Sequence, residues 1–396
     1  MIFSLIRFSM RTPSIAFSII SFLLVTLLGS HINVAQAKSA LSLLELPSRE
    51  SSLASKSVLM AMTPSSGVIL AVGERGHIIN WQSDDNWQQQ QSPVSVSITE
   101  ATILSDGSKI AVGHDGVILK ADAESTTWRK VFTGAEITKL KIALMQKQHE
   151  ALQQIIIKTQ DEDELEELTY QLDDLAFFIE EGQLELESGP NKPLLSVTRT
   201  SNDTLIASGA YGTLLISKDK GETWQLISDK LDNPESFHLN SVISTSNDQL
   251  YIVGENGTAF HSDNLGQTWS AMTLPYSGSL FGIIANVDST NKSNDKPQLV
   301  AFGLQGNLMI SLDGGTNWQH KKLPTSASLL GGSFSKQGSA YLVGHGGIVV
   351  NFIPSNLASL NIKKHPSGAA LSSVLVKGNA LILAGQFGIS KWLIKE

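Results

Sequence analysis

The chain has 396 residues, of which 41% are hydrophobic, 17% charged and 7% aromatic, and it contains 32 glycines and no cysteine. This composition excludes a disordered, a collagen-like and a purely coiled-coil chain. The lack of cysteine excludes disulfides, thiolate metal sites, thiol nucleophiles and lipid-modified cysteine anchors. The formal net charge is −8, and residues 135–190 alone hold 14 Asp and Glu against 4 Lys. Because no basic stripe is present, we expect no nucleic-acid partner.

Residues 1–37 have the pattern of a secretory signal peptide. Arg7 and Arg11 precede an apolar run from Ile15 to Gly29, and Ala35-Gln36-Ala37 offers a small-x-small cleavage site. The alternative is an uncleaved membrane anchor, although the run is shorter than the ~20 residues of a full span. An exported chain without cysteine suits a bacterial periplasm, so we predict a periplasmic protein that is soluble once the signal is cleaved.

A Gly-x-x-Gly motif follows an apolar strand pattern seven times. Its first glycines are Gly73, Gly113, Gly209, Gly254, Gly303, Gly344 and Gly385. They are 40, 96, 45, 49, 41 and 41 residues apart, so only the second interval differs, and it equals one period plus an insertion of about 55 residues. Each repeat contains four strand signals. The pattern predicts an all-β fold, a seven-bladed β-propeller of four-stranded blades.

The repeats divide the mature chain into blades one and two (residues 38–132) and blades three to seven (residues 191–396). In the third repeat the strand signals cover residues 194–200, 204–208, 213–217 and 223–227. The last repeat has no fourth strand before Glu396. We therefore predict that residues 39–46 supply that strand and close the ring, which removes exposed strand edges.

The insertion, residues 133–190, has the period of helices instead. Apolar residues step by three and four along its second half: Leu165, Leu168, Leu172, Leu175 and Ile179. This predicts an acidic helical hairpin with a coiled-coil seam. Thr133 with Glu136, and Thr159 with Glu162, are expected to form capping boxes, and Gly182 is expected to end the second helix. We expect the propeller to fold without this insertion.

Three repeats carry a Ser-x-Asp-x-Gly-x-Thr-Trp motif between the third and fourth strands; it is complete in the first, has Asn for Asp in the second and has Asn for Thr in the third. The residues are Ser217, Asp219, Gly221, Thr223 and Trp224; Ser262, Asn264, Gly266, Thr268 and Trp269; and Ser311, Asp313, Gly315 and Trp318. The acidic or amide side chain can accept backbone N–H bonds, the glycine suits a left-handed turn, and the tryptophan can pack between sheets. We predict a structural role, and the alternative is a calcium or glycan site.

These motifs resemble the Asp-boxes of sialidase-type (BNR) repeats. Across essentially the whole mature chain, the repeats resemble the photosystem II stability/assembly factor family. The resemblance implies an exported seven-bladed propeller, related to sialidases in fold only, that docks like a chaperone on membrane protein complexes. Two features depart from that family. The chain adds an acidic hairpin, and in place of the family's basic docking patch it has only Arg49, Arg75, Arg129 and Arg199 after residue 37. Family analogy therefore also allows a role at another envelope complex, such as an exporter of the resistance-nodulation-division type.

In a four-stranded blade, the turns between strands two and three (the 2–3 turns) and the connections from one blade to the next emerge on the same face. We therefore expect the Gly-x-x-Gly turns and the hairpin to share a face, opposite the Asp-boxes. The predicted partner contacts are Arg75, His114, Asp115, Tyr211, Glu255, Asn256, Gln305, His345, Gln386 and Phe387. Their mixture of polar and aromatic side chains is typical of protein recognition. The alternative is that they are ordinary solvated turn residues and that the hairpin is a solvated face.

The sequence predicts no catalytic residue, metal, cofactor or small-molecule substrate. A sialidase needs three clustered arginines, a tyrosine nucleophile with a glutamate, and an acid/base aspartate. Four arginines could barely supply that cluster, and Arg129 lies in an outer strand. The histidines have no metal-ligand spacing. We therefore expect a non-enzymatic protein-binding propeller whose partner is a membrane protein complex; the alternative is a sialidase-like glycoside hydrolase or a glycan-binding propeller.

Overall fold

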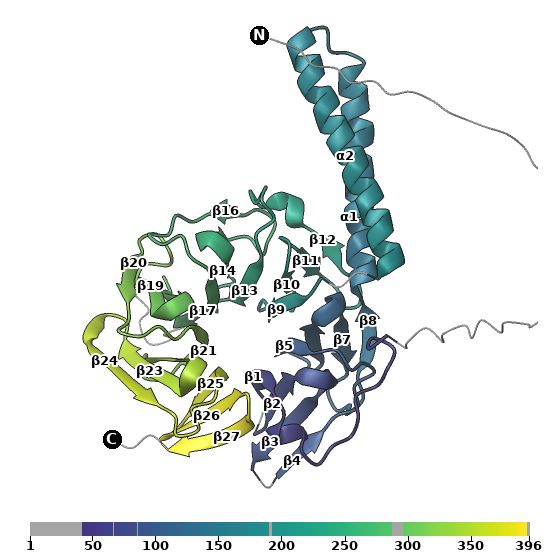
Figure 1. The fold of residues 1–396 in the computed structure, drawn as a ribbon. Helices are drawn as coiled ribbons and strands as arrows, with labels where there is room; N and C mark the ends of the chain where they lie inside the picture. Colours follow the sequence, from purple (N-terminus) through teal and green to yellow (C-terminus); the bar gives the residue numbers. More distant parts are fainter. Residues whose placement is uncertain (1–41, 66, 85, 190–191, 287–295, 394–396) are drawn as a thin grey trace, which may run out of the picture. The chain divides into compact units, whose positions relative to one another are not determined.

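The computed structural model describes residues 42–65, 67–84, 86–189, 192–286 and 296–393. The predicted signal peptide lies outside these residues. The described chain is a β-propeller of seven antiparallel sheets, of which six have four strands and one has three (Figure 1). Within each sheet the strands are hydrogen-bonded in chain order.

The first sheet contains β1 (Leu59–Pro64), β2 (Ile69–Gly73), β3 (Ile78–Ser83) and β4 (Asn86–Gln89). The second contains β5 (Ile98–Ile103), β6 (Lys109–Gly113), β7 (Ile118–Ala121) and β8 (Arg129–Phe132). Two helices follow, α1 (Gly134–Ile156) and α2 (Glu162–Ser188). The third sheet contains β9 (Leu194–Arg199), β10 (Leu205–Gly209), β11 (Leu214–Ser217) and β12 (Gln225–Leu226).

The fourth sheet contains β13 (Leu239–Ser244), β14 (Leu250–Gly254), β15 (Ala259–Ser262) and β16 (Ser270–Ala271). The fifth contains β17 (Leu280–Asn286), β18 (Gln298–Gly303), β19 (Asn307–Ser311) and β20 (Gln319–Lys322). The sixth contains β21 (Leu329–Phe334), β22 (Ala340–Gly344), β23 (Ile348–Ile353) and β24 (Asn356–Lys364). The seventh contains β25 (Leu371–Lys377), β26 (Ala380–Gly385) and β27 (Gly388–Leu393).

The sheets form a ring through their first strands. Contacts join β1, β5, β9, β13, β17, β21 and β25 in succession, and β25 contacts β1. Each of these strands has a register shift that leaves one residue unpaired. The seven unpaired residues are Met60, Thr99, Leu195, Asn240, Phe281, Leu330 and Ser372.

Three of the unpaired residues tie neighbouring sheets together. The Thr99 hydroxyl donates to the Leu194 carbonyl at 2.8 Å, and the Asn240 amide donates to the Leu280 carbonyl at 2.8 Å. The Ser372 hydroxyl donates to the Leu59 carbonyl at 2.7 Å, which joins the seventh sheet to the first. The bulges therefore place polar side chains where consecutive sheets meet.

The predicted closing strand at residues 39–46 is wrong over its described part, residues 42–46, which forms turns. The Leu43 carbonyl accepts a bond from the Ser95 amide at 2.8 Å, and Lys130 Nζ donates to the Leu44 carbonyl at 3.0 Å. Leu44 packs against the hydrophobic cluster of the first two sheets, while Leu43 stays 53% exposed. The seventh sheet keeps three strands, and a short 3-10 turn, Ala54–Lys56, contacts β27.

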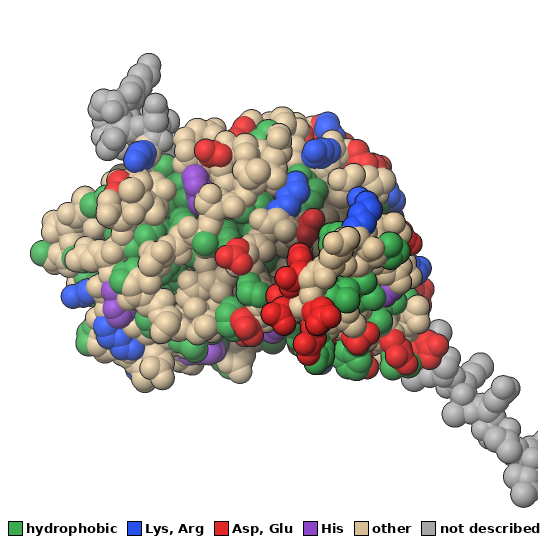
Figure 2. Space-filling view, turned by 90° about the horizontal axis from the view of Figure 1, so that it is seen from above, with side chains coloured by type: hydrophobic (Ala, Val, Ile, Leu, Met, Phe, Trp, Pro, Cys, Tyr) green, Lys and Arg blue, Asp and Glu red, His purple; other side chains and the backbone are tan. Residues whose placement is uncertain are grey.

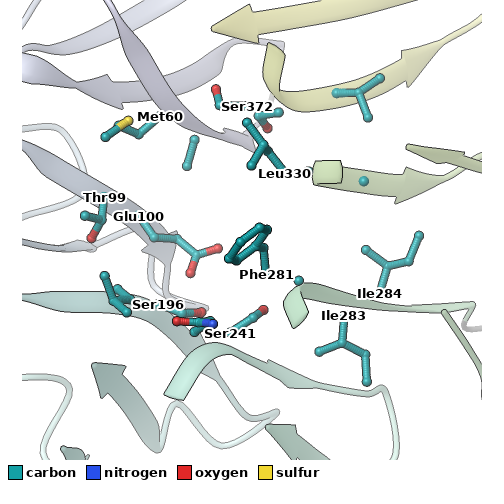
Figure 3. A pocket seen from close by; sticks show the side chains of 18 of the residues that line it. Met60, Thr99, Glu100, Ser196, Ser241, Phe281, Ile283, Ile284, Leu330 and Ser372 are labelled. Atoms are coloured by element: carbon teal, nitrogen blue, oxygen red, sulfur yellow. The ribbon is translucent and has the colours of Figure 1, made fainter. Parts of the chain in front are cut away.

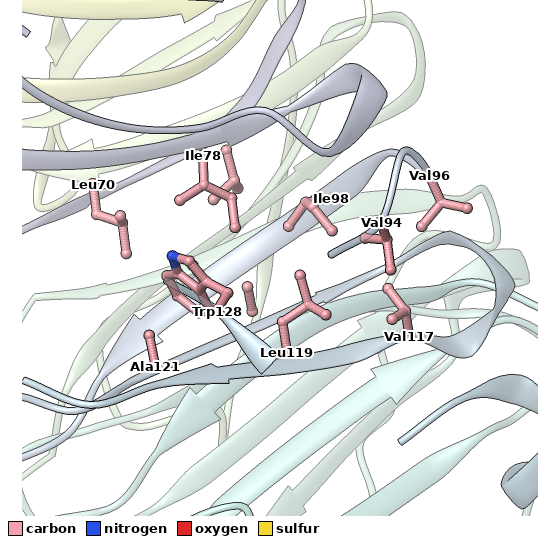
Figure 4. Packing of buried hydrophobic residues seen from close by; sticks show 12 residues of the cluster. Leu70, Ile78, Val94, Val96, Ile98, Val117, Leu119, Ala121 and Trp128 are labelled. Carbon is pink, nitrogen blue, oxygen red and sulfur yellow. The ribbon is translucent and has the colours of Figure 1, made fainter. Parts of the chain in front are cut away.

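Hydrophobic side chains fill the space between adjacent sheets. Figure 4 shows the first of these clusters, in which Leu70 and Ile78 of one sheet meet Ile98 and Leu119 of the next around Trp128. The second strands of the first four sheets are buried along their whole length. These strands are mostly apolar on both faces, with Lys109 and Ser208 as buried exceptions, because a neighbouring sheet covers each face.

The helical hairpin differs from the prediction at two of its ends. The capping box at the start of α1 is confirmed, since the Thr133 amide donates to Glu136 Oε2 at 2.9 Å. The second predicted box is wrong: Asp161 caps α2 by accepting from the Glu164 amide at 3.0 Å. The Thr159 hydroxyl instead donates to the Ile155 carbonyl, so Thr159 belongs to the end of α1.

Gly182 does not end α2, which continues to Ser188. A Cβ at Gly182 would lie 2.8 Å from Ile142 Cγ1, so the glycine allows α1 and α2 to approach closely. The helix ends at Gly189, whose φ of +91° is open to glycine but rarely to other residues. No helix within the described part of the chain is long and apolar enough to cross a membrane.

Candidate functional site

The seven 2–3 turns are attached to the strand connections by a recurring contact. The first glycine of each turn lies so close to the residue before the inner strand that a Cβ would meet its carbonyl oxygen at 2.0 to 2.5 Å. The same carbonyl accepts a bond from the next amide of the turn at 2.9 to 3.1 Å in all seven sheets. This contact explains the first glycine of the motif and places the 2–3 turns beside the sheet connections.

Most predicted partner contacts are exposed in these turns. Arg75, His114, Tyr211, Asn256, Gln305, His345, Gln386 and Phe387 are exposed, while Asp115 and Glu255 are partly buried. Five of the residues have a left-handed backbone, with φ between +51° and +57°: Arg75, Asp115, Tyr211, Asn256 and Gln305. This conformation is uncommon for a residue with a bulky side chain such as Tyr211.

The turn of the third sheet meets the base of the hairpin. Lys141 of α1 points its Nζ at the Tyr211 carbonyl, 3.4 Å away, and at the Thr213 hydroxyl, 3.3 Å away. Burial and, to a smaller extent, the neighbouring Lys192 charge lower the pKa of Lys141 to about 8, while Glu185 acts in the opposite direction. The hairpin and the turns thus share a face, at least where α1 joins the third sheet.

The ring of Tyr211 contacts both a cation and an imidazole. Lys192 Nζ is 5.6 Å from the ring centroid of Tyr211 and 2.6 Å from Glu185 Oε2 of α2. The Tyr211 and His238 rings meet edge to face at 5.0 Å, and His238 Nδ1 is 3.6 Å from Glu255 Oε1. Tyr211 remains 51% exposed. We call Lys141, Glu185, Lys192, Tyr211, His238 and Glu255 the hairpin-base cluster.

Of the ten predicted contacts, the cluster contains Tyr211 and Glu255. The other eight lie in the turns of their own sheets and are not part of it. Four members of the cluster were not predicted from the sequence: Lys141, Glu185, Lys192 and His238. His238 directly precedes the inner strand β13, and Lys192 lies two positions before the inner strand β9.

The inner strands also surround a central channel with a cavity of about 280 Å³ (Figure 3). Glu100 is the one charged side chain among its lining residues, and Phe281 lies beside it. Burial raises the pKa of Glu100 to about 7, while bonds from Ser196 and from the Val197 amide, 2.9 Å away, favour its ionised form. A near-neutral pKa allows this carboxyl to be protonated or ionised at physiological pH.

The arrangement that a sialidase would need is not assembled in this channel, because its lining residues include neither arginine nor tyrosine. Arg129 instead bonds Glu222 at 2.6 Å on an outer strand, and Arg199 lies 3.4 Å from Asp203. Within the described ranges, no group of three or more His, Cys, Asp or Glu side chains could hold a metal ion.

The three Ser-x-Asp turns share one hydrogen-bond network. Asp219 Oδ1 accepts from the Ser217 hydroxyl at 2.8 Å and from the Thr223 amide at 2.9 Å, and Ser217 Oγ accepts from the Gly221 amide at 2.9 Å. Asn264 makes the same two bonds with Ser262 and Thr268, and Asp313 makes them with Ser311 and Asn317.

The other members of these turns have equally local contacts. Gly221, Gly266 and Gly315 have φ between +78° and +87°, and Trp224, Trp269 and Trp318 pack against the clusters between sheets. Lys220 Nζ bonds Asp106 Oδ2 at 2.7 Å, so the third sheet's turn meets the turn between β5 and β6. The contacts of the three turns are those of a structural element.

Comparison with known proteins adds evidence for the fold. The model of a family described as the DUF6242 beta propeller domain matches residues 200–338. No curated protein matches the chain. Among solved structures, YCF48 from Cyanidioschyzon merolae has a TM-score of 0.53 at 12% identity, covering 86% of this chain and 96% of that chain.

Two further structures are similar. The WD40 beta propeller domain of Doa1 has a TM-score of 0.54 at 10% identity, over 88% of this chain and 95% of that one. YCF48 bound to a D1 peptide has a TM-score of 0.47 at 13% identity, over 75% and 80% of the two chains. The chain is therefore a β-propeller, and it shares this fold with YCF48 and with the WD40 domain of Doa1.

Proposed function

We propose that this chain is a non-enzymatic protein-binding propeller of the periplasm that serves a membrane protein complex as an assembly or accessory factor. An exporter is one such complex. The observation that carries the proposal is Tyr211, which is half exposed and contacts Lys192 and His238 where the hairpin joins the turns.

The chemistry of the hairpin-base cluster suits a protein partner. Tyrosine offers a large amphipathic contact area with few rotatable bonds, which is why it is enriched at energetically important interface positions. Around it, Lys141 and Lys192 supply positive charge and Glu185 and Glu255 negative charge within one small region. Such mixed charge gives orientation and selectivity to a polar interface.

The central channel supports an enzymatic role less well. Its cavity of about 280 Å³ holds one ionisable side chain, Glu100, and the paired carboxylates of a glycosidase are not found among the residues that line it. The likeness to YCF48 adds analogy of fold, which is compatible with a docking role but does not determine function.

In-cell crosslinking followed by affinity purification of the full-length protein tests the proposal. Tyr211→Asn removes the aromatic ring, and asparagine tolerates the left-handed backbone at this position. We expect it to reduce the recovery of a membrane complex by about tenfold, as expected for loss of an interface anchor.

The matched control is Lys218→Ser, which changes an exposed residue in a Ser-x-Asp turn and should leave recovery unchanged. Both variants must keep the thermal midpoint of the unchanged protein. Equal recovery with Tyr211→Asn, or glycans in place of a protein partner, would overturn the proposal.

A further inference from the structure

An apolar stripe on α2 has no partner within the described structure. Tyr170, Phe177 and Leu184 follow one another at intervals of seven residues and are 64%, 57% and 52% exposed. Seven residues make nearly two helical turns, so the three side chains lie on one face over a length of about 21 Å. We call these three residues the outer stripe.

The outer stripe is separate from the seam that holds the hairpin together. The seam residues Leu165, Leu168, Leu172, Leu175 and Ile179 are partly buried, and α1 contacts α2. At about 100° per residue, the centre of the outer stripe lies on the opposite side of α2 from the centre of the seam. The rings of Phe177 and Phe178 meet edge to face, with their centroids 5.6 Å apart, and Phe178 therefore widens the exposed apolar surface.

Acidic side chains flank the outer stripe on α2. This helix contains eleven Asp and Glu and no Lys or Arg. Glu166, Asp173, Asp174, Glu180 and Glu181 are exposed on the same half of the helix as the stripe. Tyr170 donates its hydroxyl to Glu166 at 3.2 Å beside a hollow of about 400 Å³. Figure 2 shows acidic and hydrophobic side chains lying next to each other on one part of the surface.

A hairpin that was only solvated would need no large apolar residues at this spacing, because a helix exposed on one side is ordinarily polar there. A heptad of exposed apolar residues is the pattern that receives another helix in a coiled coil. The charges select among helices, since the exposed carboxylates beside the outer stripe, on a helix without Lys or Arg, favour a partner of opposite charge.

We propose that the outer stripe binds a basic amphipathic helix of a partner protein, which adds to α1 and α2 as a third helix. Its apolar residues cover Tyr170, Phe177 and Leu184, and its lysines and arginines pair with the flanking carboxylates. This inference rests on the proposed function and names the chemistry of the partner. Two copies of α2 would bring like charges together, which disfavours a second copy of the chain as the occupant.

Peptide binding to the full-length protein tests the inference. The probe is a fluorescein-labelled helical peptide of three heptads with leucine at the a and d positions and lysine at e and g, followed by fluorescence anisotropy. A second peptide has glutamate in place of lysine, and a third keeps lysine but has serine in place of leucine. We expect the first peptide to bind, more weakly at higher salt, and the other two to fail.

The test variant is Tyr170→Ser/Phe177→Ser/Leu184→Ser, in which we expect the affinity for the first peptide to fall at least about tenfold. The matched control is Leu312→Ser/Ile353→Ser/Leu393→Ser, which changes three apolar residues of similar exposure (45%, 40% and 54%) outside the hairpin. We expect this control to bind the peptide like the unchanged protein.

Equal binding of the lysine and glutamate peptides, or unchanged binding by the test variant, would overturn the inference. So would self-association that the test variant abolishes in sedimentation velocity, since a second copy would then be the occupant. Tyr211→Asn should bind the peptide normally. If no peptide binds while crosslinked recovery still depends on Tyr211, the inference about the outer stripe is wrong and the proposed function stands. If the lysine peptide binds as expected while recovery does not depend on Tyr211, the proposed function alone is contradicted.

Discussion

Glu100 is a single residue whose pKa is raised by its position in the propeller channel. The inner strands surround its carboxyl, and burial raises its pKa to about 7 from an ordinary value of 4.5. Between these two values the folded protein keeps a proton that the unfolded chain releases. The free energy of unfolding therefore falls as pH rises through this window, and the stabilisation by the neutral carboxyl is fully present only below it.

We predict that Glu100→Gln flattens this pH dependence. Glutamine cannot ionise, and its carbonyl can still accept the Val197 amide bond. At pH 8 the variant should exceed the unchanged protein in free energy of unfolding by about 1–3 kcal/mol, and near pH 4.5 the two should be similar. Urea denaturation across this range measures both. Glu235→Gln, at an exposed turn, is the control, and equal pH dependence for Glu100→Gln and the unchanged protein would contradict the prediction.

The Ser-x-Asp turns show that one network accepts different side chains. Asn264 keeps the acceptor bonds of Asp219 while its amide donates to the Thr268 hydroxyl at 2.7 Å, where Asp219 accepts from Thr223 instead. The hydroxyl can reverse its role because it both donates and accepts. What the turn requires is a side-chain oxygen at this position, not a negative charge.

We therefore predict that Asp219→Asn is tolerated and Asp219→Ala is not. Alanine leaves the Thr223 amide and the Ser217 hydroxyl without their acceptor, which should lower the free energy of unfolding by about 1–2 kcal/mol. Asparagine should change it by less than about 0.5 kcal/mol, as expected where the bonds are kept. Chemical denaturation of the two variants provides the comparison, and equal losses would show that the charge matters.

Among the secondary-structure elements, those that recur in every repeat could be predicted from the sequence, whereas those whose limits depend on a single tertiary contact could not. The strands and 2–3 turns could be predicted because seven copies carry the same glycines, and Thr133 could be recognised because its cap is local. Gly182 was misread because a glycine inside a helix has the same local signature whether it ends the helix or faces Ile142. Residues 42–46 were misread because alternation does not distinguish a strand from a turn packed on a neighbouring sheet.

The candidate site was predictable only in part for the same reason. Tyr211 and Glu255 belong to a repeated motif, so the pattern pointed to them. Lys141, Glu185 and Lys192 belong to the insertion or to its junction with β9. Their approach to Tyr211 depends on how α1 and α2 meet the third sheet, and no repeat encodes that geometry.

The base of the hairpin is part of the propeller core, which changes what its removal should do. Ile137 of α1 is 1% exposed and packs in the cluster between the second and third sheets. Deleting residues 133–190 removes this side chain and should destabilise the propeller by about 2–5 kcal/mol, the range for loss of a large buried aliphatic group. We therefore expect the propeller to fold stably without the outer part of the hairpin, and to lose stability when the base is removed as well.

We predict that joining Met145 to Ile179 by a short glycine-serine loop leaves a propeller that melts cooperatively near the temperature of the unchanged protein. The shortened hairpin keeps Ile137 and the Ile142–Gly182 contact. Calorimetry of the two deletions side by side checks this. A shortened hairpin that melts as low as the full deletion would show that the outer hairpin also stabilises the sheets.

At the scale of the whole molecule, the ring closes without a shared sheet. The seventh sheet keeps three strands, and closure relies on contacts of β25 with β1 and on a hydrophobic cluster that includes Leu59, Ile382 and Ile389. Gly388 belongs to this junction, because a Cβ there would lie 2.0 Å from the Ser55 carbonyl oxygen. Side-chain packing and the Ser372 hydroxyl thus join the seventh sheet to the first, in place of a strand contributed by the N-terminal part of the chain.

We predict that Ser372→Ala weakens this closure specifically. The Ser372 hydroxyl is the donor that links the seventh sheet to the first, and its loss leaves the Leu59 carbonyl without that bond at a junction that no covalent link supports. We expect a loss of about 1 kcal/mol in the free energy of unfolding. The control is Ser373→Ala, whose hydroxyl has no hydrogen bond among the described residues, and hydrogen exchange locates the effect. Faster exchange confined to β1 and β25 identifies the junction as the place where the ring opens first, whereas uniform exchange in all seven sheets would contradict that role.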